Sequence, residues 1–334
     1  MSAGATTYSG GFARDLSRYA TPALAALKII YRAALAALAV WLLASIRSGS
    51  SPEVYALTYA ISLIAVYMAL DGTSFRVWAL YVTGFILFAQ LRGHADGMGM
   101  PVQFDYPVAM EKALFFGTIP SIWLQDQFYT FARLGPLETY TIGVYLAYFF
   151  APHALAFALW RFDNDRFKTY AFSFMLTLYL GLLTAALLPT APPWMAGQLG
   201  HIPHVYQVLP DVSGEVAPGA YQNVYQIAGA NNVAAMPSLH AAIPFLMAIA
   251  LWKYRWLRWA GAAFAVSMLF SIVYLGEHYA VDGLAGWAVA GAAWAGVTAF
   301  RAKREASAAI RAAQDTIVGS PAPSPELASS ARER

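Results

Sequence analysis

The sequence predicts an all-α, polytopic membrane protein. Of its 334 residues, 59% are hydrophobic and 12% are charged, whereas soluble proteins average roughly half apolar and a quarter charged residues. Apolar runs of about 20 residues, the length that crosses a bilayer as a helix, recur along the chain. Lys and Arg gather in alternate connections between these runs, which is the pattern of a multi-pass protein.

About eight of the apolar runs are predicted to span the membrane. They lie at 24–46, 54–70, 75–91, 140–160, 169–188, 238–253, 256–275 and 280–299. With a cytoplasmic N-terminus, seventeen of the 21 Lys and Arg residues fall on the cytoplasmic side, and the outside holds only Arg47, Arg92, Lys112 and Arg133. This asymmetry predicts a cell-membrane protein with both termini in the cytoplasm.

The chain divides into three regions. We expect a cytoplasmic N-terminal segment at 1–23, a transmembrane domain at 24–300 and a basic, partly disordered cytoplasmic tail at 301–334. The Ala-rich start of the tail predicts that the last helix continues past the membrane, and its Pro- and Ser-rich end predicts disorder. The chain has no cysteine, which excludes disulfides and thiolate metal sites.

Two outer segments, about 92–139 and 189–237, are too long to be simple connections. Segments of this length in a compact protein are usually lids or binding walls. The first contains an amphipathic stretch with Trp123, Phe128 and Tyr129, which suits the membrane interface. The second leads from a Pro-rich start into the first of two histidine motifs.

The two histidine motifs are Met-Pro-Ser-Leu-His, which ends at His240, and His-Tyr-Ala-Val-Asp, from His278 to Asp282. The topology places both histidines at the outer membrane surface. On a helix, positions four residues apart share a face, so the carboxylate of Asp282 can reach one ring nitrogen of His278 and leave the other free. A histidine held in this way is typical of a nucleophile or a general base.

The residues before His240 predict the start of a helix. Proline is tolerated in the first turn, as at Pro237, and the hydroxyl of Ser238 can cap the helix. His240 is then expected beside backbone N–H groups at the positive end of the helix dipole, which is a setting that suits phosphate.

The histidine motifs resemble the second and third signature motifs of the type 2 phosphatidic acid phosphatase superfamily. The chain is most similar to the sphingolipid-synthase branch, typified by inositolphosphorylceramide synthase, because Pro192-Pro193-Trp194 matches its Pro-Pro-Trp loop. The segment Glu111–Gly117 is weakly similar to an upstream segment of that branch. The resemblance covers about 100–300 and implies a six-helix catalytic core.

The resemblance also implies roles for three residues. His278 attacks phosphorus and forms a phosphohistidine, Asp282 orients His278, and His240 protonates the departing alkoxide and then deprotonates the acceptor. Phosphoryl transfer requires positioning and charge stabilisation, and two histidines can exchange protons near neutral pH. The family requires no metal, and we expect neither metal nor cofactor.

The phosphate-binding cation differs from the family pattern. The phosphatases of the superfamily have an arginine six residues before the histidine of the third motif, whereas this chain has Ile272. The positive charge must come from elsewhere, and Arg92 and Lys112 are the candidates. The other predicted substrate-binding residues lie near these cations or in the motifs: Asp96, Asp105, Pro193, Trp194 and Ser238.

Several other residues have plainer interpretations. Glu277 is either a second base or headgroup ligand, or a solvent-facing neighbour. Trp194 fits an interfacial belt better than a stacking platform, and His201 and His204 fit a loop better than a metal site. His153 is expected to form a buried interhelical hydrogen bond, and the Ala/Gly pattern after Asp282 predicts close helix packing.

Three functions are compatible with these features. The first is a phosphotransferase that moves a phospho-headgroup, such as phosphoinositol, from a membrane phospholipid to a lipid alcohol. The second is a lipid phosphatase acting on a phospholipid or polyprenyl phosphate, in which water replaces the alcohol. The third is a proton-coupled transporter with His278 and Asp282 as a relay; the absence of an inverted repeat argues against it. No nucleic-acid partner is expected, and the oligomeric state stays open.

Overall fold

A computed structural model of the protein describes residues 26, 29–35, 37, 75–92, 99–216 and 232–318. Over this part of the chain every regular element is a helix. The predicted span at 54–70, the segment 1–23 and the end of the tail from 319 onward lie outside the described residues. The span at 24–46 is described only in part.

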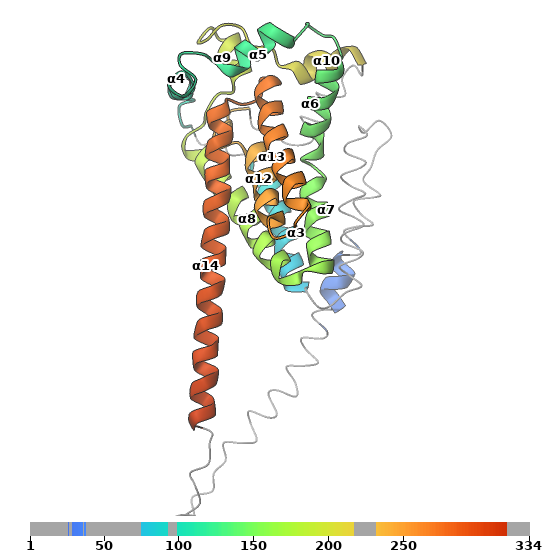
Figure 1. The fold of residues 1–334 in the computed structure, drawn as a ribbon, viewed down its shortest axis with the longest axis vertical. Coiled ribbons are helices and arrows are strands. Elements are labelled where there is room, and N and C mark those ends of the chain that lie inside the picture. Colours follow the sequence, from blue (N-terminus) through green and yellow to red (C-terminus); the bar gives the residue numbers. More distant parts are fainter. Residues whose placement is uncertain are drawn as a thin grey trace, which may run out of the picture.

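The described helices form a bundle with a layer of short helices across one end (Figure 1). The long helices of the bundle are α3 (Phe75–Arg92), α6 (Pro136–Ala147), α7 (Ala151–Phe162), α8 (Asn164–Leu187), α12 (Leu239–Leu251), α13 (Leu257–Tyr274) and α14 (Ala280–Val318). The short helices of the layer are α4 (Asp105–Leu114), α5 (Pro120–Phe128), α9 (Pro193–Gln198) and α10 (Val208–Val216).

Three described helices are long and apolar enough to cross a membrane, and the bent pair α6 and α7 adds a fourth if it counts as one span. The protein is therefore a membrane protein. The predicted span at 140–160 is not one straight helix, because α6 and α7 meet at 48° around residues 148–150. The predicted span at 238–253 is the 13-residue helix α12, which at about 1.5 Å per residue is shorter than the roughly 30 Å hydrocarbon layer.

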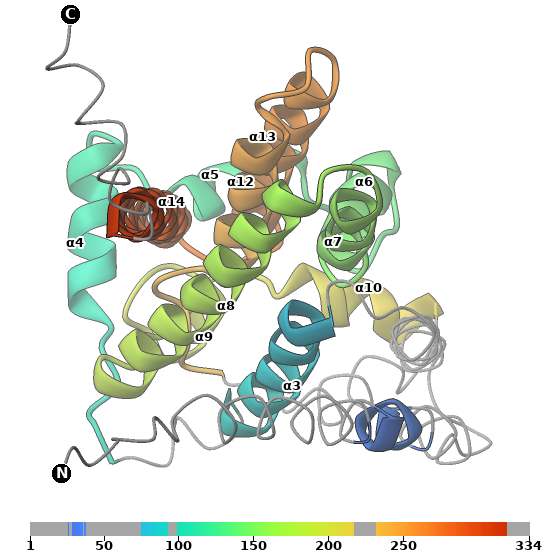
Figure 2. The same cartoon turned by 90° about the horizontal axis from the view of Figure 1, so that it is seen from below.

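The short helix α12 is the centre of the bundle and contacts α7, α8, α13 and α14 (Figure 2). Its buried face joins a core cluster with aromatic residues of α3 and α8, among them Trp78, Phe167 and Tyr170. Close approach on its other side confirms the predicted packing of the Ala/Gly pattern. A side chain at Gly286 of α14 would meet the carbonyl oxygen of Ser238 at 2.3 Å.

The two ends of the bundle differ in character. At one end lie the short helices and the starts of α12 and α14 (Figure 1). At the other end, exposed tryptophans and basic residues follow α12 and continue into the first turn of α13, where Arg255 lies over the ring of Trp256 and Arg258 lies over the ring of Trp259. Helix α14 continues beyond this end to Val318, which confirms the predicted continuation of the last helix.

Candidate active site

His240 lies in the first turn of α12, as predicted from the residues before it. The hydroxyl of Ser238 accepts a hydrogen bond from the backbone N–H of Ala241 at 3.3 Å and caps the helix. The half-buried imidazole stacks on the ring of Tyr145 at a centroid distance of 4.6 Å and packs against the tilted ring of Tyr148 at 4.5 Å. The cap fixes where the helix begins, and the tyrosines fix the plane of the ring.

His278 lies in a tight turn between α13 and α14, not on a helix with Asp282. The carbonyl oxygen of Ile272 accepts hydrogen bonds from the N–H groups of both Glu277 and His278 at 3.1 Å. Gly276 has a φ of 77°, and a side chain there would meet the carbonyl oxygen of Tyr206 at 2.4 Å. Because only glycine tolerates both conditions, the turn requires glycine at this position.

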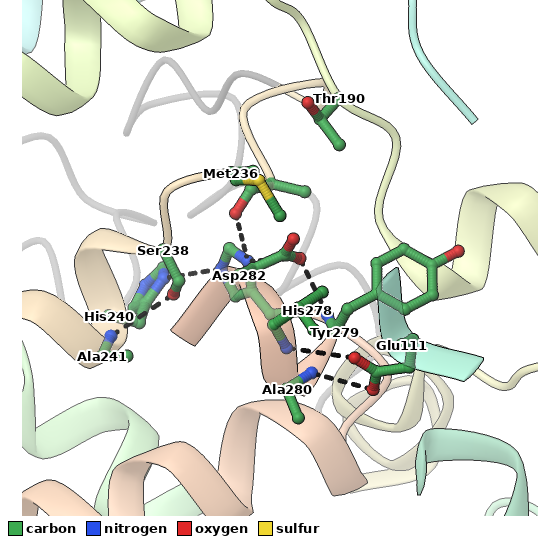
Figure 3. Close-up of polar contacts among 12 residues, drawn as sticks. Glu111, Thr190, Met236, Ser238, His240, Ala241, His278, Tyr279, Ala280 and Asp282 are labelled. Carbon is green, nitrogen blue, oxygen red and sulfur yellow. Dashed lines mark hydrogen bonds and ion pairs between the residues drawn. The ribbon is translucent and has the colours of Figure 1, made fainter. Parts of the chain in front are cut away.

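The two histidines meet directly (Figure 3). His240 Nδ1 lies 3.3 Å from His278 Nε2, and His278 Nδ1 lies 2.9 Å from the carbonyl oxygen of Ala235. A carbonyl oxygen can only accept a hydrogen bond, so Nδ1 of His278 carries a proton. In the neutral ring Nε2 then has a free lone pair, and His240 Nδ1–H donates to it. The neighbours thus determine the tautomers of both rings.

Asp282 lies beside His278 but does not make its closest contact. The carboxylate oxygen Oδ2 is 3.7 Å from His278 Nδ1, and it accepts a hydrogen bond from the N–H of Tyr279 at 2.8 Å. The nearest partner of Nδ1 is instead Ala235, whose carbonyl no sequence motif indicates. Oδ1 of Asp282 is buried and has no hydrogen-bond partner among the described residues. The nearest partner of His278 Nδ1 is thus a backbone carbonyl, with the carboxylate close by, and the orientation of His278 by Asp282 stays a prediction.

Two glutamates near the turn are not among the predicted site residues. Glu277 is 8% exposed and accepts a hydrogen bond from Gln207 at 3.2 Å, so its solvent-facing interpretation is wrong. Burial raises its pKa to about 7. Glu111, on α4, is fully buried and accepts hydrogen bonds from the N–H groups of Ala280 and Val281 at 3.0 Å each (Figure 3). Its signal in the sequence is the weak similarity of the segment Glu111–Gly117 to the synthase branch, which gives no role to the carboxylate.

The cations predicted to bind phosphate differ in position. Arg92, at the end of α3, lies within electrostatic range of His240 and Tyr148. Lys112 is exposed on α4, and Asp105 is exposed at the start of the same helix. No contact with the two histidines is observed for either of them. Asp96 lies outside the described residues. The structure thus brings Arg92, but not Lys112, toward the histidines.

The Pro-Pro-Trp segment is attached to the histidine turn. Pro193 is buried at the start of α9, and the backbone N–H of Trp194 donates to the carbonyl oxygen of Gly276 at 3.2 Å. The Trp194 side chain is half-buried. The observed contact of Trp194 with the turn therefore runs through its backbone.

The other histidines among the described residues have structural partners. His201 stacks on Phe104 at 4.1 Å, and His204 packs edge-on against Tyr206. His153 bonds to the hydroxyl of Tyr81 at 2.9 Å, which confirms the predicted interhelical hydrogen bond. Within the described ranges, no group of three or more His, Cys, Asp or Glu side chains is arranged to hold a metal ion.

Comparison with known proteins assigns the chain to a family. A model of the PAP2 superfamily matches residues 108–296, which include both histidine motifs and run from within α4 to within α14. No curated protein and no solved structure matches the chain. Since the matched region is more than half of the chain, the protein belongs to the PAP2 superfamily, whose members are generally phosphatases and phosphotransferases.

Proposed function

We propose that the protein transfers a phospho-headgroup from a membrane phospholipid to a lipid alcohol through a phosphohistidine on His278. The observation that carries the proposal is the contact of His278 Nε2 with His240 Nδ1 at 3.3 Å. Because Nδ1 of His278 faces the carbonyl oxygen of Ala235, we assign a lone pair to His278 Nε2 and a proton to His240 Nδ1. A nucleophile and a proton donor at one point are the two groups that displacement at phosphorus requires.

The first half of the reaction uses both groups together. The lone pair of His278 Nε2 forms a bond to phosphorus, the bond from phosphorus to the diacylglycerol oxygen breaks, and His240 Nδ1–H protonates that oxygen. In-line attack places the leaving oxygen opposite Nε2, so the two rings separate when the substrate enters between them. The phosphorylated ring is positively charged, and the carboxylate of Asp282 at 3.7 Å stabilises it.

The second half reverses the proton transfer. The acceptor hydroxyl gives its proton to His240 Nδ1, its oxygen bonds to phosphorus, and the phosphorus–nitrogen bond breaks to restore His278. Ile272, where the phosphatases have an arginine by the family resemblance, is fully buried among apolar side chains. We therefore assign the phosphate charge to Arg92, which lies in electrostatic range of His240.

Transfer to an alcohol is preferred over hydrolysis because of the surroundings of the pair. His278 is 7% exposed, and aromatic rings of Tyr145, Tyr148 and Phe149 surround His240. A site that limits the access of water protects a reactive intermediate from hydrolysis. The resemblance to inositolphosphorylceramide synthase suggests phosphoinositol as the headgroup and a ceramide-like or diacylglycerol-like acceptor.

One assay separates transfer from hydrolysis. The purified protein in liposomes receives a phospholipid labelled in its headgroup, with or without diacylglycerol or ceramide. We expect a labelled new lipid that forms only when the acceptor is present. Release of free headgroup phosphate or phosphate, independent of the acceptor, would show a hydrolase instead. If no phospholipid gave either product, both the transferase and the hydrolase assignment would be contradicted.

The Asp282→Asn variant tests whether Asp282 supplies charge to His278 or also orients its ring. Because Ala235 already selects the tautomer, the amide is expected to preserve the ring orientation and to remove only the charge that stabilises the phosphorylated ring. We expect kcat to fall on the order of tenfold to a hundredfold, less than the roughly 10⁴-fold loss seen where the aspartate alone holds the histidine. Turnover kinetics on the labelled phospholipid measure this loss, and a 10⁴-fold fall would show that Asp282 also orients the ring.

A further inference from the structure

The carboxylate of Glu111 reaches the start of α14 from a distant part of the chain. Its two oxygens accept hydrogen bonds from the N–H groups of Ala280 and Val281 at 3.0 Å each, and its side chain is fully buried. Asp282 accepts from the preceding N–H, that of Tyr279. Two carboxylates therefore satisfy the first three N–H groups in the region where α14 begins, and these are groups that no intrahelical bond can satisfy.

The turn that these bonds fix is the one that carries His278. Glu111 accepts hydrogen bonds from residues 280 and 281, immediately after the turn. On the other side of the turn, the carbonyl oxygen of Ile272 accepts hydrogen bonds from Glu277 and His278. The carbonyl oxygen of Asp282 in turn accepts a hydrogen bond from the N–H of Ser238 at 3.0 Å. The start of α12, which carries His240, is thus hydrogen-bonded to the start of α14, which follows His278. Glu111 of α4 is hydrogen-bonded to the same start of α14.

A buried carboxylate in this position is not explained by stability alone. Burying a charge costs several kcal/mol unless hydrogen bonds and dipoles compensate for it, and a local residue such as serine caps a helix without that cost. The two N–H donors and the positive end of the α14 dipole compensate here. They are also the groups that a substrate phosphate would otherwise bind. With Glu111 in place, phosphate is left with the side of the site formed by α12 and Arg92.

Helix α4 itself lies at the surface. Met110, Leu114 and Phe116 are exposed apolar residues on and just after it, and Glu111 extends from the same helix into the joint between the histidine motifs. The helix contacts α14 near the end of the bundle where the site lies (Figure 1). We propose that Glu111 is a positioning residue for the phosphoryl transfer proposed above, and that its ionised carboxylate keeps the His278 turn in place from an interfacial helix.

The inference implies a dependence on pH. Burial raises the pKa of Glu111 to about 7, and the two N–H donors oppose the rise. The titratable groups that face Glu111 among the described residues are Asp282 on α14, whose charge also raises this pKa, and Tyr279 in the turn. Below pH 7 the protonated acid loses its charge and one acceptor, so the turn loosens. Above pH 7 the turn is held.

The test compares Glu111→Gln and Glu111→Asp with the wild type and with Asp126→Asn, which removes an exposed carboxylate from α5 at the same end of the bundle. We expect kcat of Glu111→Gln to fall about tenfold or more, because the turn is displaced, while KM changes less. We expect Glu111→Asp to recover part of the loss because it keeps the charge.

The pH profile of kcat gives a second comparison. Its acidic limb should be steeper in the wild type than the limb of a single titrating group, and in Glu111→Gln it should have the slope of a single group. Asp126→Asn should match the wild type.

Hydrogen exchange gives a readout that needs no substrate. Backbone amides 280 and 281 should exchange faster in Glu111→Gln than in the wild type and Asp126→Asn. Unchanged kcat and pH profile in Glu111→Gln, or no recovery in Glu111→Asp, would overturn the inference about Glu111. The proposed function would still stand if the activity depended on His278. A wild type without phosphoryl transfer would instead remove the proposed function, and the exchange result would still show whether Glu111 holds the turn.

Discussion

Substitution of His278 by alanine is expected to lower phospholipid turnover on the order of a thousandfold or more. The ring supplies a lone pair that faces a proton donor, at 3.3 Å from His240 Nδ1, and an enzyme that loses its nucleophile retains only the contribution of binding and charge. Turnover of headgroup-labelled phospholipid by the wild type and the variant measures the loss.

A second measurement follows the intermediate itself. Rapid acid-free denaturation of the wild type during turnover should leave label from the headgroup phosphate on the peptide that contains residue 278, and His278→Ala should leave none. His201→Ala is the matched control, because this exposed ring stacks on Phe104 away from the histidine pair. Turnover of His278→Ala within tenfold of the wild type would mean that another group attacks phosphorus.

Substitution of His240 by alanine is expected to cost between a hundredfold and ten-thousandfold, the usual contribution of a general acid. The cost should depend on the leaving group. A diacylglycerol oxygen needs a proton when it departs, whereas a nitrophenol departs as a stable anion. We therefore expect a large loss with phospholipid and a much smaller loss with a nitrophenyl phosphodiester.

This difference between substrates distinguishes proton donation from packing. The ring of His240 packs against Tyr145 and Tyr148, and a merely structural role would lower turnover of both substrates by the same factor. His240→Gln keeps more of the volume and should show the same dependence on the leaving group as His240→Ala. Equal losses for phospholipid and nitrophenyl ester in both variants would argue against proton donation by His240.

Much of the fold was predictable because a helix that crosses a bilayer needs a long run of apolar residues, and such runs are visible in the sequence. Apolar runs of the right length located α8, α13 and α14, and the continuation of α14 followed from its Ala-rich tail. Two predicted spans differ in form from a single long helix. The run at 140–160 contains Pro152 in the first turn of α7, which is a signal for a helix start that a hydropathy pattern ignores. The run at 238–253 does not show that its helix is too short to cross alone. Hydropathy measures neither the direction of a helix nor its packing against other helices.

The histidine pair itself was predictable at the level of location. Ser238 capped the helix as its residue type suggested, and two motifs at alternate span starts met at one end of the bundle. The distance between His278 and Asp282 also came out short, although His278 precedes the helix. The four-residue spacing predicted Asp282 as a neighbour of His278 because both were expected on one helix, whereas the two are close because a turn leads into α14.

The sequence by itself determined that the protein lies in a membrane, that its two histidines share a site and that arginine is missing at position 272. These are properties of residue type and spacing, which act locally. Only the tertiary structure decided that Ala235 selects the tautomer of His278 and that Glu111 holds the start of α14 across 169 and 170 positions of chain. A backbone carbonyl has no residue signature, and a contact between distant segments is set by how the helices pack.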